Sequence, residues 1–300
     1  MNGGRTPSPG RSASGDGVRV TMRQRSIYVT IDLEGVTGVT ALDQVRHGSP
    51  EFHDTRLRLT DEVNAAIAGA REAGLASVLV NEGHGQHRNI VPERLDQEAR
   101  LLTGRNKLLH YMHGIDGGFD GAFFIGYHAG AGERDGVLGH TFHAARCLIN
   151  DRPFTEVSLG MALAGHHGVP TLLVTGDEAT CRHARACVAG IETVAVKEAI
   201  SANAAVHMHP DAAQRAIREA AQRALARADD IQPFIVPSPH VLDLHLYSPL
   251  MADLHEYVPT CQRMGDLHVR YTASDMADAF RFFLLSSTLS MTASGLGVMH

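Results

Sequence analysis

The sequence lacks the features of a membrane-bound or exported protein. No apolar run approaches the roughly 20 residues that a membrane-spanning helix needs. The first 24 residues are rich in Gly, Ser, Arg and Pro and contain no apolar segment of the kind found in secretory signals. We therefore expect no membrane partner, and we predict that residues 1–24 form a disordered tail.

A surplus of positive charge is also absent. Lysine and arginine together number 27, against 33 aspartates and glutamates, and the formal net charge is -6. Proteins that bind nucleic acids usually carry a basic surplus or a basic stripe. We therefore expect no nucleic-acid partner, and small substrates or other proteins are the better class of ligand.

Cysteine is scarce and shows no pattern. The four cysteines, Cys147, Cys181, Cys187 and Cys261, contain no Cys-x-x-Cys pair and lie in segments typical of core or helix. With 44% hydrophobic residues in a chain of 300, the protein can bury a sizeable core without disulfide bonds. A reducing compartment, the cytoplasm, fits this pattern best.

What the sequence does contain is an alternation of strand-like and helix-like segments from residue 25 onward, typical of an α/β protein. We predict a mostly parallel sheet with flanking helices. Its strands are expected at residues 27–34, 76–81, 121–127, 146–150, 170–175 and 193–196. Its helices are expected at residues 51–73, 92–100, 155–166 and 179–189, with Gly74 ending the first and Thr155 capping the third.

The character of the chain changes near residue 200. Five prolines interrupt the segment between residues 233 and 259, and short alternating strands replace the buried runs seen earlier. The expected elements are helices at residues 211–228 and 274–288 and strands at residues 241–246 and 267–271. We therefore predict a catalytic α/β domain at residues 25–200 and a smaller C-terminal α+β lobe at residues 201–300.

Acid or imidazole side chains accompany the ends of three predicted strands. Asp32 and Glu34 end the first, His84 follows the second, and His128 follows the third. Alternate residues of a strand share a face, so Asp32 and Glu34 should point the same way. The carboxyl ends of parallel strands lie side by side, where an open sheet forms its ligand crevice. The sequence therefore predicts a metal site at this edge of the larger domain.

The residue types at this edge suit zinc, which accepts imidazole nitrogen and carboxylate oxygen. No cysteine is placed to act as a ligand, which is typical of a catalytic site. A site for two ions needs a third carboxylate, and Glu156 at a predicted helix start is the best candidate. With Asp32 bridging, two ions about 3.5 to 4 Å apart would lower the pKa of a shared water to about 7, which suits hydrolysis of amides or phosphate esters.

Each of these groups has a simpler interpretation when it is taken alone. An Asp-x-Glu pair is usually a solvated strand end, and a histidine after a strand is usually a hydrogen-bonded loop residue. The coincidence of three strands at one edge favours a metal site. By contrast, His166 and His167 before Gly168 are interpreted as a helix end, and the glycine-rich segment 126–139 lacks the Gly-Lys-Ser/Thr of a phosphate loop.

Several motifs, in order along the chain, resemble those of the D-aminopeptidase DppA family, the M55 metallopeptidases. The family's Asp-x-Glu-Gly is matched at residues 32–35 and its Gly-Tyr-His-Ala at residues 126–129. Its Asn-Asp-Arg-Pro turn is matched at residues 150–153, followed by the helix-opening Glu156. The resemblance extends from about residue 26 to about residue 290.

The resemblance implies a set of site residues. The family's metal ligands fall on Asp32, Glu34, His84, His128 and Glu156, and its catalytic histidine falls on His140, which transfers protons beside the metals. Zinc is implied, two ions per chain, with manganese or cobalt left open. Where the family typically has Asp-Ser-His, this chain has Glu82-Gly83-His84, so any supporting role of that acid would use a longer side chain.

The resemblance also implies an activity and an assembly. We expect a zinc-dependent aminopeptidase that hydrolyses short peptides with an amino-terminal D-residue by two-metal activation of water. A ring-shaped decamer with active sites facing an inner cavity is implied as well. Two alternatives stay open: a two-metal hydrolase of other amides or phosphate esters, and a metal-binding assembly protein without catalysis. Retention of all five ligands and His140 argues against the second.

Overall fold

The larger sheet has seven strands in the order β3-β2-β1-β4-β7-β8-β9. The structure is a computed structural model and describes residue 1 and residues 24–296, so the tail predicted at residues 1–24 falls almost wholly outside the described residues. All neighbouring strands pair in parallel except β8 and β9. The strands are β1 (Arg25–Ile31), β2 (Leu75–Glu82), β3 (Arg100–Leu102), β4 (Gly121–Tyr127), β7 (Thr171–Asp177), β8 (Glu192–Ser201) and β9 (Ala204–His207).

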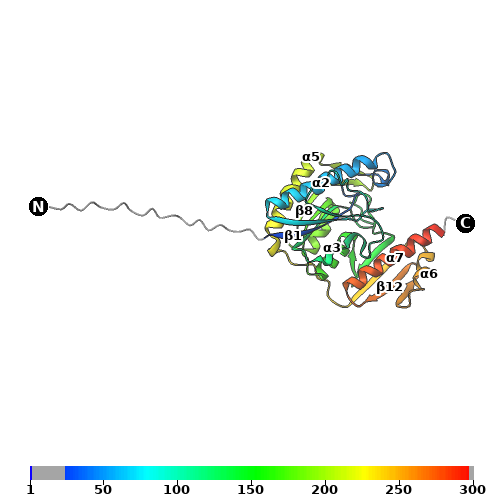
Figure 1. The fold of residues 1–300 in the computed structure, drawn as a ribbon. Coiled ribbons are helices and arrows are strands. Elements are labelled where there is room, and N and C mark those ends of the chain that lie inside the picture. Colours follow the sequence, from blue (N-terminus) through cyan, green and yellow to red (C-terminus); the bar gives the residue numbers. More distant parts are fainter. Residues whose placement is uncertain (2–23, 297–300) are drawn as a thin grey trace.

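Helices cover both faces of this sheet. On one face α2 packs against α5, and on the other α3 and α4 lie against β7 and its neighbours (Figure 1). The right-handed connection between parallel strands explains why the helices lie on different faces. The chain moves toward one edge of the sheet from β1 to β2, and toward the other edge from β4 through β7 to β8. The helices are α1 (Leu42–Val45), α2 (Phe52–Glu72), α3 (Glu156–His166), α4 (Glu178–Cys187) and α5 (Pro210–Ala226).

The predicted helix ends are confirmed where local chemistry sets them. Gly74 has φ +95°, a left-handed conformation that glycine adopts without strain after α2. The Thr155 hydroxyl accepts a hydrogen bond from Ser158 N at 3.5 Å, which caps α3 directly before Glu156. Pro210 occupies the first turn of α5, where a missing N–H costs nothing.

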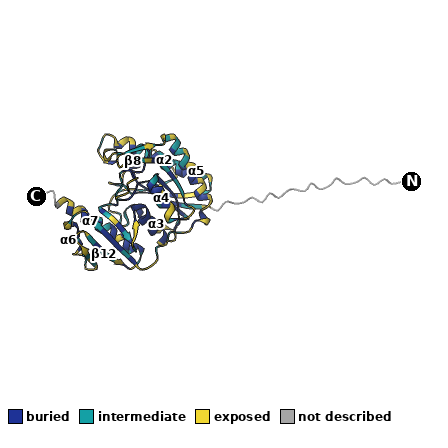
Figure 2. Ribbon diagram, turned by 180° about the vertical axis from the view of Figure 1, so that it is seen from behind, coloured by how far each residue is buried: buried dark blue, intermediate teal, exposed yellow. Residues whose placement is uncertain are grey.

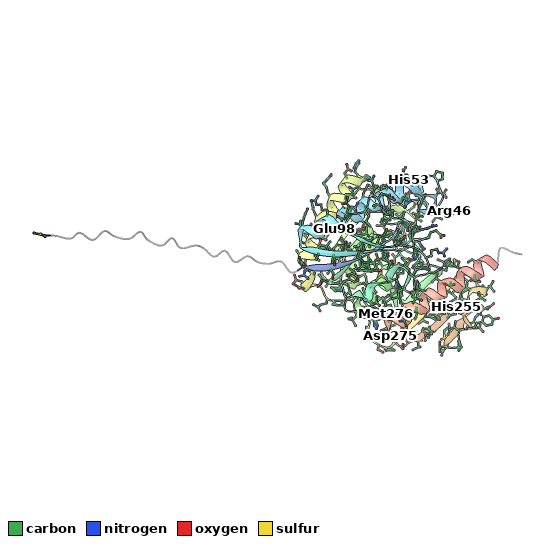
Figure 3. The ribbon with its side chains drawn as sticks, viewed as in Figure 1. Arg46, His53, Glu98, His255, Asp275 and Met276 are labelled. Carbon is green, nitrogen blue, oxygen red and sulfur yellow. The ribbon has the colours of Figure 1, made fainter. Side chains whose placement is uncertain are left out.

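A second, antiparallel sheet forms the smaller lobe, in the order β11-β12-β10-β5-β6. Its elements are β5 (Ala144–Ile149), β6 (Arg152–Phe154), β10 (His240–Leu246), β11 (Cys261–Gly265), β12 (His268–Ala273), α6 (Pro249–His255) and α7 (Met276–Leu296). Buried His255 joins the two helices, with Nε2 2.7 Å from the Ser286 hydroxyl (Figure 3). The expected fold class, a mostly parallel α/β sheet with a smaller α+β lobe, is confirmed.

The two sheets do not divide the chain at a single point. Strands β5 and β6 precede residue 200 yet pair with the C-terminal strands, whereas β9 and α5 follow it and pack with the larger sheet. The boundary at residue 200 therefore stays a prediction about folding units. Among the described residues, no helix combines the length and the apolar character that crossing a bilayer requires.

One expected helix is wrong. Residues 92–100 form turns that lead into β3, because side chains of α2 bind their backbone. Asn64 accepts a hydrogen bond from Asp96 N at 2.8 Å and donates one to Arg94 O at 2.7 Å. Such long-range capture of main-chain groups is invisible in the local sequence pattern.

The centre of the larger sheet is fully enclosed. Every residue of β4 and β7 is buried, and α3 is buried from Glu156 to Gly165 (Figure 2). Such strands read as continuous apolar runs because both faces are covered by helices. The carboxyl ends of these rigid strands therefore form a fixed platform for side chains.

Candidate functional site

The register of the sheet places three strand ends at one level. Ile31, the last residue of β1, lies opposite Glu82 of β2 on one side and Ile125 of β4 on the other. The chain leaves β1 and β4 in opposite directions, so the gap between these strands is the topological switch point, where open α/β sheets bind ligands. Asp32 and Glu34 were expected to end the strand itself. They lie instead in the turn beyond β1, one and three residues after its last residue.

Two glycines let the turns after β1 and β4 touch. Gly35 N donates a hydrogen bond to Gly126 O at 2.8 Å. A Cβ on Gly35 would lie 1.9 Å from Tyr127 O, and Gly126 has φ +76° with space for no side chain beside Asp32 O. The close approach brings Glu34, which precedes Gly35, and His128, two residues after Gly126, to the same side of the sheet edge.

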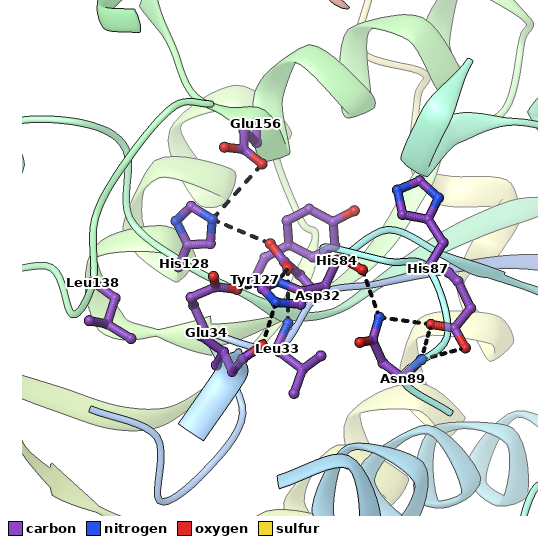
Figure 4. A network of polar contacts seen from close by, with 12 residues as sticks. Asp32, Leu33, Glu34, His84, His87, Asn89, Tyr127, His128, Leu138 and Glu156 are labelled. Carbon is purple, nitrogen blue, oxygen red and sulfur yellow. Dashed lines mark hydrogen bonds and ion pairs between the residues drawn. The ribbon is translucent and has the colours of Figure 1, made fainter. Parts of the chain in front are cut away.

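Asp32 lies between two histidines (Figure 4). Its Oδ1 is 3.1 Å from His84 Nδ1, and its Oδ2 is 3.3 Å from His128 Nε2. Glu34 Oε2 lies 2.9 Å from the same nitrogen of His84. Asp32 therefore faces both halves of the site with its two oxygens.

Glu156 and His140 complete the second half. Glu156 Oε2 is 3.9 Å from His128 Nε2, and Glu156 Oε1 is 3.7 Å from His140 Nε2. The rings of His128 and His140 stack with centroids 4.0 Å apart. The structure thus brings all six predicted site residues together; four are buried, His84 is partly buried, and the His140 side chain is 38% exposed. Their chemical roles remain predictions.

Backbone carbonyls orient all three histidines. His84 Nε2 lies 2.9 Å from Val45 O, His128 Nδ1 lies 2.8 Å from Ala129 O, and His140 Nδ1 lies 2.8 Å from Leu138 O. A carbonyl can only accept, so each of these ring nitrogens carries a proton. The opposite nitrogen faces the carboxylates, as in histidines that bind metals.

The electrostatics of the site couple acids to imidazoles. Burial opposes ionisation of Asp32, but the adjacent imidazoles of His128 and His84 and their charges hold its pKa well below the usual value. Burial alone would lower the pKa of His128, yet the Asp32 carboxylate 3.3 Å away and the charges of Glu156 and Glu34 raise it to about 10. Burial raises the pKa of Glu156. Protons on the imidazoles balance the carboxylates, and a cation that binds here must displace them.

The donor set fits a divalent cation. Glu34 Oε2 and His128 Nε2 are buried and make no hydrogen bond within the described part of the chain, although charged groups lie close to both. Two groups each present three ligand atoms within 4.8 Å of one another: Asp32, Glu34 and His84, and His128, His140 and Glu156. Nitrogen and oxygen donors without sulfur are a combination that zinc accepts in catalytic sites.

Glu82, the acid that replaces the family's aspartate, acts on the loop and not on the His84 ring. Its carboxylate accepts hydrogen bonds from Asn89 N at 2.7 Å and from Ile90 N at 2.9 Å (Figure 4). Asn89 Nδ2 in turn donates to His84 O at 2.9 Å. The longer side chain therefore closes the loop that carries His84.

Lys197 on β8 supports the loop that carries Glu34, a role the sequence did not reveal. Its buried ammonium donates to Glu34 O, to Val36 O at 3.0 Å and to Val39 O at 2.8 Å. Burial lowers the pKa of Lys197 to about 8, against the raising effect of nearby carboxylates. A single side chain thus satisfies three carbonyls of one irregular loop.

Replacing Lys197 by methionine is expected to lower the free energy of unfolding by about 3 kcal/mol or more, because three buried carbonyl oxygens lose their donor. Urea denaturation measures the change. Arg215→Met, on the exposed side of α5, is the control and should stay within about 0.5 kcal/mol of the wild type. Equal stability of Lys197→Met and the wild type would show that the loop does not need the ammonium.

A cavity of about 770 Å³ opens beside the six residues. Asp32, Glu34, His84, His140 and Glu156 line one part of it. Apolar side chains line another part of the cavity. They come from α7 and from the loop before β5, and they are Leu284, Leu285, Met291 and Phe142. The volume lies in the range typical of small-molecule sites.

The model of the D-aminopeptidase family, peptidase family M55, matches residues 25–285. The chain belongs to the D-aminopeptidase family. The resemblance inferred from the motifs is thereby confirmed, and this family member is a peptide hydrolase.

Two comparisons agree with the family assignment. A D-aminopeptidase from Bacillus subtilis (strain 168) is 33% identical over 271 residues, which cover 89% of this chain and 98% of the relative. A solved structure, the Zn-dependent D-aminopeptidase DppA from Bacillus subtilis, described as a self-compartmentalizing protease, has a TM-score of 0.86 at 33% identity. That match covers 89% of this D-aminopeptidase family member and 98% of the solved chain.

Proposed function

We propose that this enzyme is a zinc-dependent aminopeptidase that removes an amino-terminal D-residue from short peptides, with two zinc ions per chain. The observation that carries the proposal is the position of Asp32, with one oxygen toward His84 and the other toward His128. A bridging carboxylate needs this arrangement. Glu34 on one side and Glu156 on the other provide each half with its own acid.

The ligand assignment follows from these contacts. Asp32, Glu34 and His84 would hold one ion, and Asp32, His128 and Glu156 the other. The zinc ions, when bound, lower the pKa of a water ligand to about 7 and polarise a carbonyl oxygen. The protein itself holds the Glu156 carboxylate in place, since its Oε1 accepts a hydrogen bond from Phe142 N at 2.7 Å.

His140 is the proton carrier in this proposal. Its Nδ1 is fixed by Leu138 O, so Nε2 is the nitrogen that faces Glu156 and the cavity. It lies near enough to the ligand set to take a proton from the attacking water and to pass one to the departing amine. It is also the most exposed member of the six, which gives substrate access to it.

Assembly and compartment are part of the same proposal. The relative DppA is described as self-compartmentalizing, and on this analogy we infer that copies of this chain form a homo-oligomer, a decamer by family resemblance. The four cysteines are all free thiols, which is compatible with the cytoplasmic compartment expected from the sequence.

Matched substrates and metal removal test the activity. The zinc-loaded enzyme should hydrolyse an alanyl dipeptide with an amino-terminal D-residue faster than its L-isomer and should not hydrolyse a phosphomonoester. Dialysis against a chelator should abolish turnover, and zinc should restore it. Full activity after complete metal removal would overturn the proposal, and turnover of the phosphomonoester alone would favour the broader two-metal hydrolase.

A further inference from the structure

Lysine occurs at only two positions in this chain, Lys107 and Lys197, against 25 arginines. Both side chains lie at the site. Lys197 is accounted for by the loop that carries Glu34, whereas the activity proposed above gives Lys107 no task. Lys107 lines the same cavity as Asp32 and His140.

The Lys107 ammonium is held at a fixed point of the cavity wall. It donates to Asn81 Oδ1 at 2.6 Å and to Glu82 O at 2.5 Å. Asn81 is itself fixed, because its Nδ2 donates to Tyr28 Oη at 2.7 Å and to His110 O at 3.2 Å. An ammonium has three N–H donors, so one remains for a ligand. Burial lowers the pKa of Lys107 to about 8, which leaves it mostly charged at neutral pH.

The charges that line the cavity are segregated. Its carboxylates are Asp32, Glu34 and Glu156, all of them in the ligand set proposed for the metals. The other charged side chains are cations, namely Arg105, Lys107 and Arg281. Within the described residues, no carboxylate lies within ion-pair distance of these three cations. The Glu82 carboxylate acts on Lys107 through its charge without forming an ion pair with it. A ligand that extends away from the metals therefore meets cations that no carboxylate in the described part of the chain contacts directly.

The spacing suits a short peptide. Lys107 is hydrogen-bonded to Glu82 O, and His84 follows Glu82 by two positions, at most about 7 Å along the chain. An extended dipeptide is also about 7 Å long. A peptide with its amino end at the metals can therefore bring its carboxyl end to the cationic wall. Arg105 and Arg281 are more exposed than Lys107.

We propose that Lys107 binds the terminal carboxylate of the peptide, so that the enzyme selects short peptides with a free carboxyl end over their amides. The inference rests on the peptidase function proposed above and names its substrate class more closely. A charge-assisted hydrogen bond recognises the carboxylate, and the neutral amide loses it and leaves the ammonium unpaired.

The test compares an alanyl dipeptide with its carboxyl-terminal amide, in the configuration that the enzyme prefers. In the wild type, kcat/KM for the free acid should exceed that for the amide by about 10- to 100-fold. In Lys107→Gln, which keeps polar hydrogen-bonding atoms near Asn81 without the charge, the ratio should fall to within about 3-fold of one. Lys107→Met is the second variant and should give the same ratio.

The ratio separates binding from structural support. If Lys107 only braces Asn81 and Glu82, both substrates lose kcat/KM together and the ratio stays at the wild-type value, which overturns the proposal. Arg88→Met removes an exposed charge that does not line the cavity and should keep the wild-type ratio. If the ratio fell as far in Arg88→Met as in Lys107→Gln, the effect would come from the overall positive charge of the protein and not from Lys107, which would also overturn the proposal. Equal rates of acid and amide in the wild type refute the inference alone, whereas no hydrolysis of either refutes the peptidase function as well.

Discussion

Asp32→Ala is expected to reduce turnover to background and to prevent uptake of both zinc ions. Asp32 is the one side chain within 3.3 Å of histidines from both halves of the site, so its loss removes an oxygen from each ion at once. His84 and His128 would also lose the negative charge that lies between them. Elemental analysis after dialysis against zinc gives the metal content, and a dipeptide assay gives the rate.

The control for this variant is Asp43→Ala, which removes an exposed acid from α1, the short helix that follows the same strand. It should keep wild-type metal content and rate. Metal-free wild-type protein provides the reference for folding, measured by circular dichroism. Two zinc ions per chain in folded Asp32→Ala would remove Asp32 from the bridging position.

His140→Ala is expected to retain zinc but to lower kcat by about 100- to 10,000-fold, the range typical of a lost proton-transfer group. The side chain is more exposed than the proposed ligands, and its Nε2 lies 3.7 Å from Glu156 Oε1. His53→Ala, on the exposed side of α2 (Figure 3), is the matched control and should behave as the wild type.

Metal analysis of the same variant decides between two roles for His140. The ring belongs to a group of three possible ligands with His128 and Glu156, so the geometry is also compatible with direct binding of an ion. Loss of one zinc per chain in His140→Ala would make it a ligand. An unchanged rate with full metal content would remove it from the mechanism altogether.

The pattern of apolar runs predicted the parts of the site that lie at strand ends. Asp32, His84 and His128 each follow a strand of a parallel sheet, and such a sheet aligns its carboxyl ends by its hydrogen-bonding register. Glu156 could be predicted for a similar reason, because the Thr155 cap marks the first turn of α3. His140 lies in an irregular loop and was found only through the family resemblance.

The supporting residues were out of reach of the sequence. Lys197 follows a predicted strand, yet nothing in the neighbouring sequence indicates that its ammonium donates hydrogen bonds to a loop more than 150 residues away. His87 and His110 also line the cavity, with their Nε2 atoms 2.9 Å apart, although they come from separate loops without a shared motif. Residues of this kind meet only after the chain has folded, so no local spacing reports them.

The sequence by itself determined the parallel α/β sheet, the helix caps and the edge at which acids and imidazoles gather, because hydrophobic period, capping residues and strand direction act within a few residues of the chain. The tertiary structure alone decided which nitrogen of each histidine faces the carboxylates, that β5 and β6 join the C-terminal strands, and that α7 lines the cavity. Those features depend on backbone carbonyls and strand edges contributed by distant segments, and their positions are set by the packing of the whole molecule.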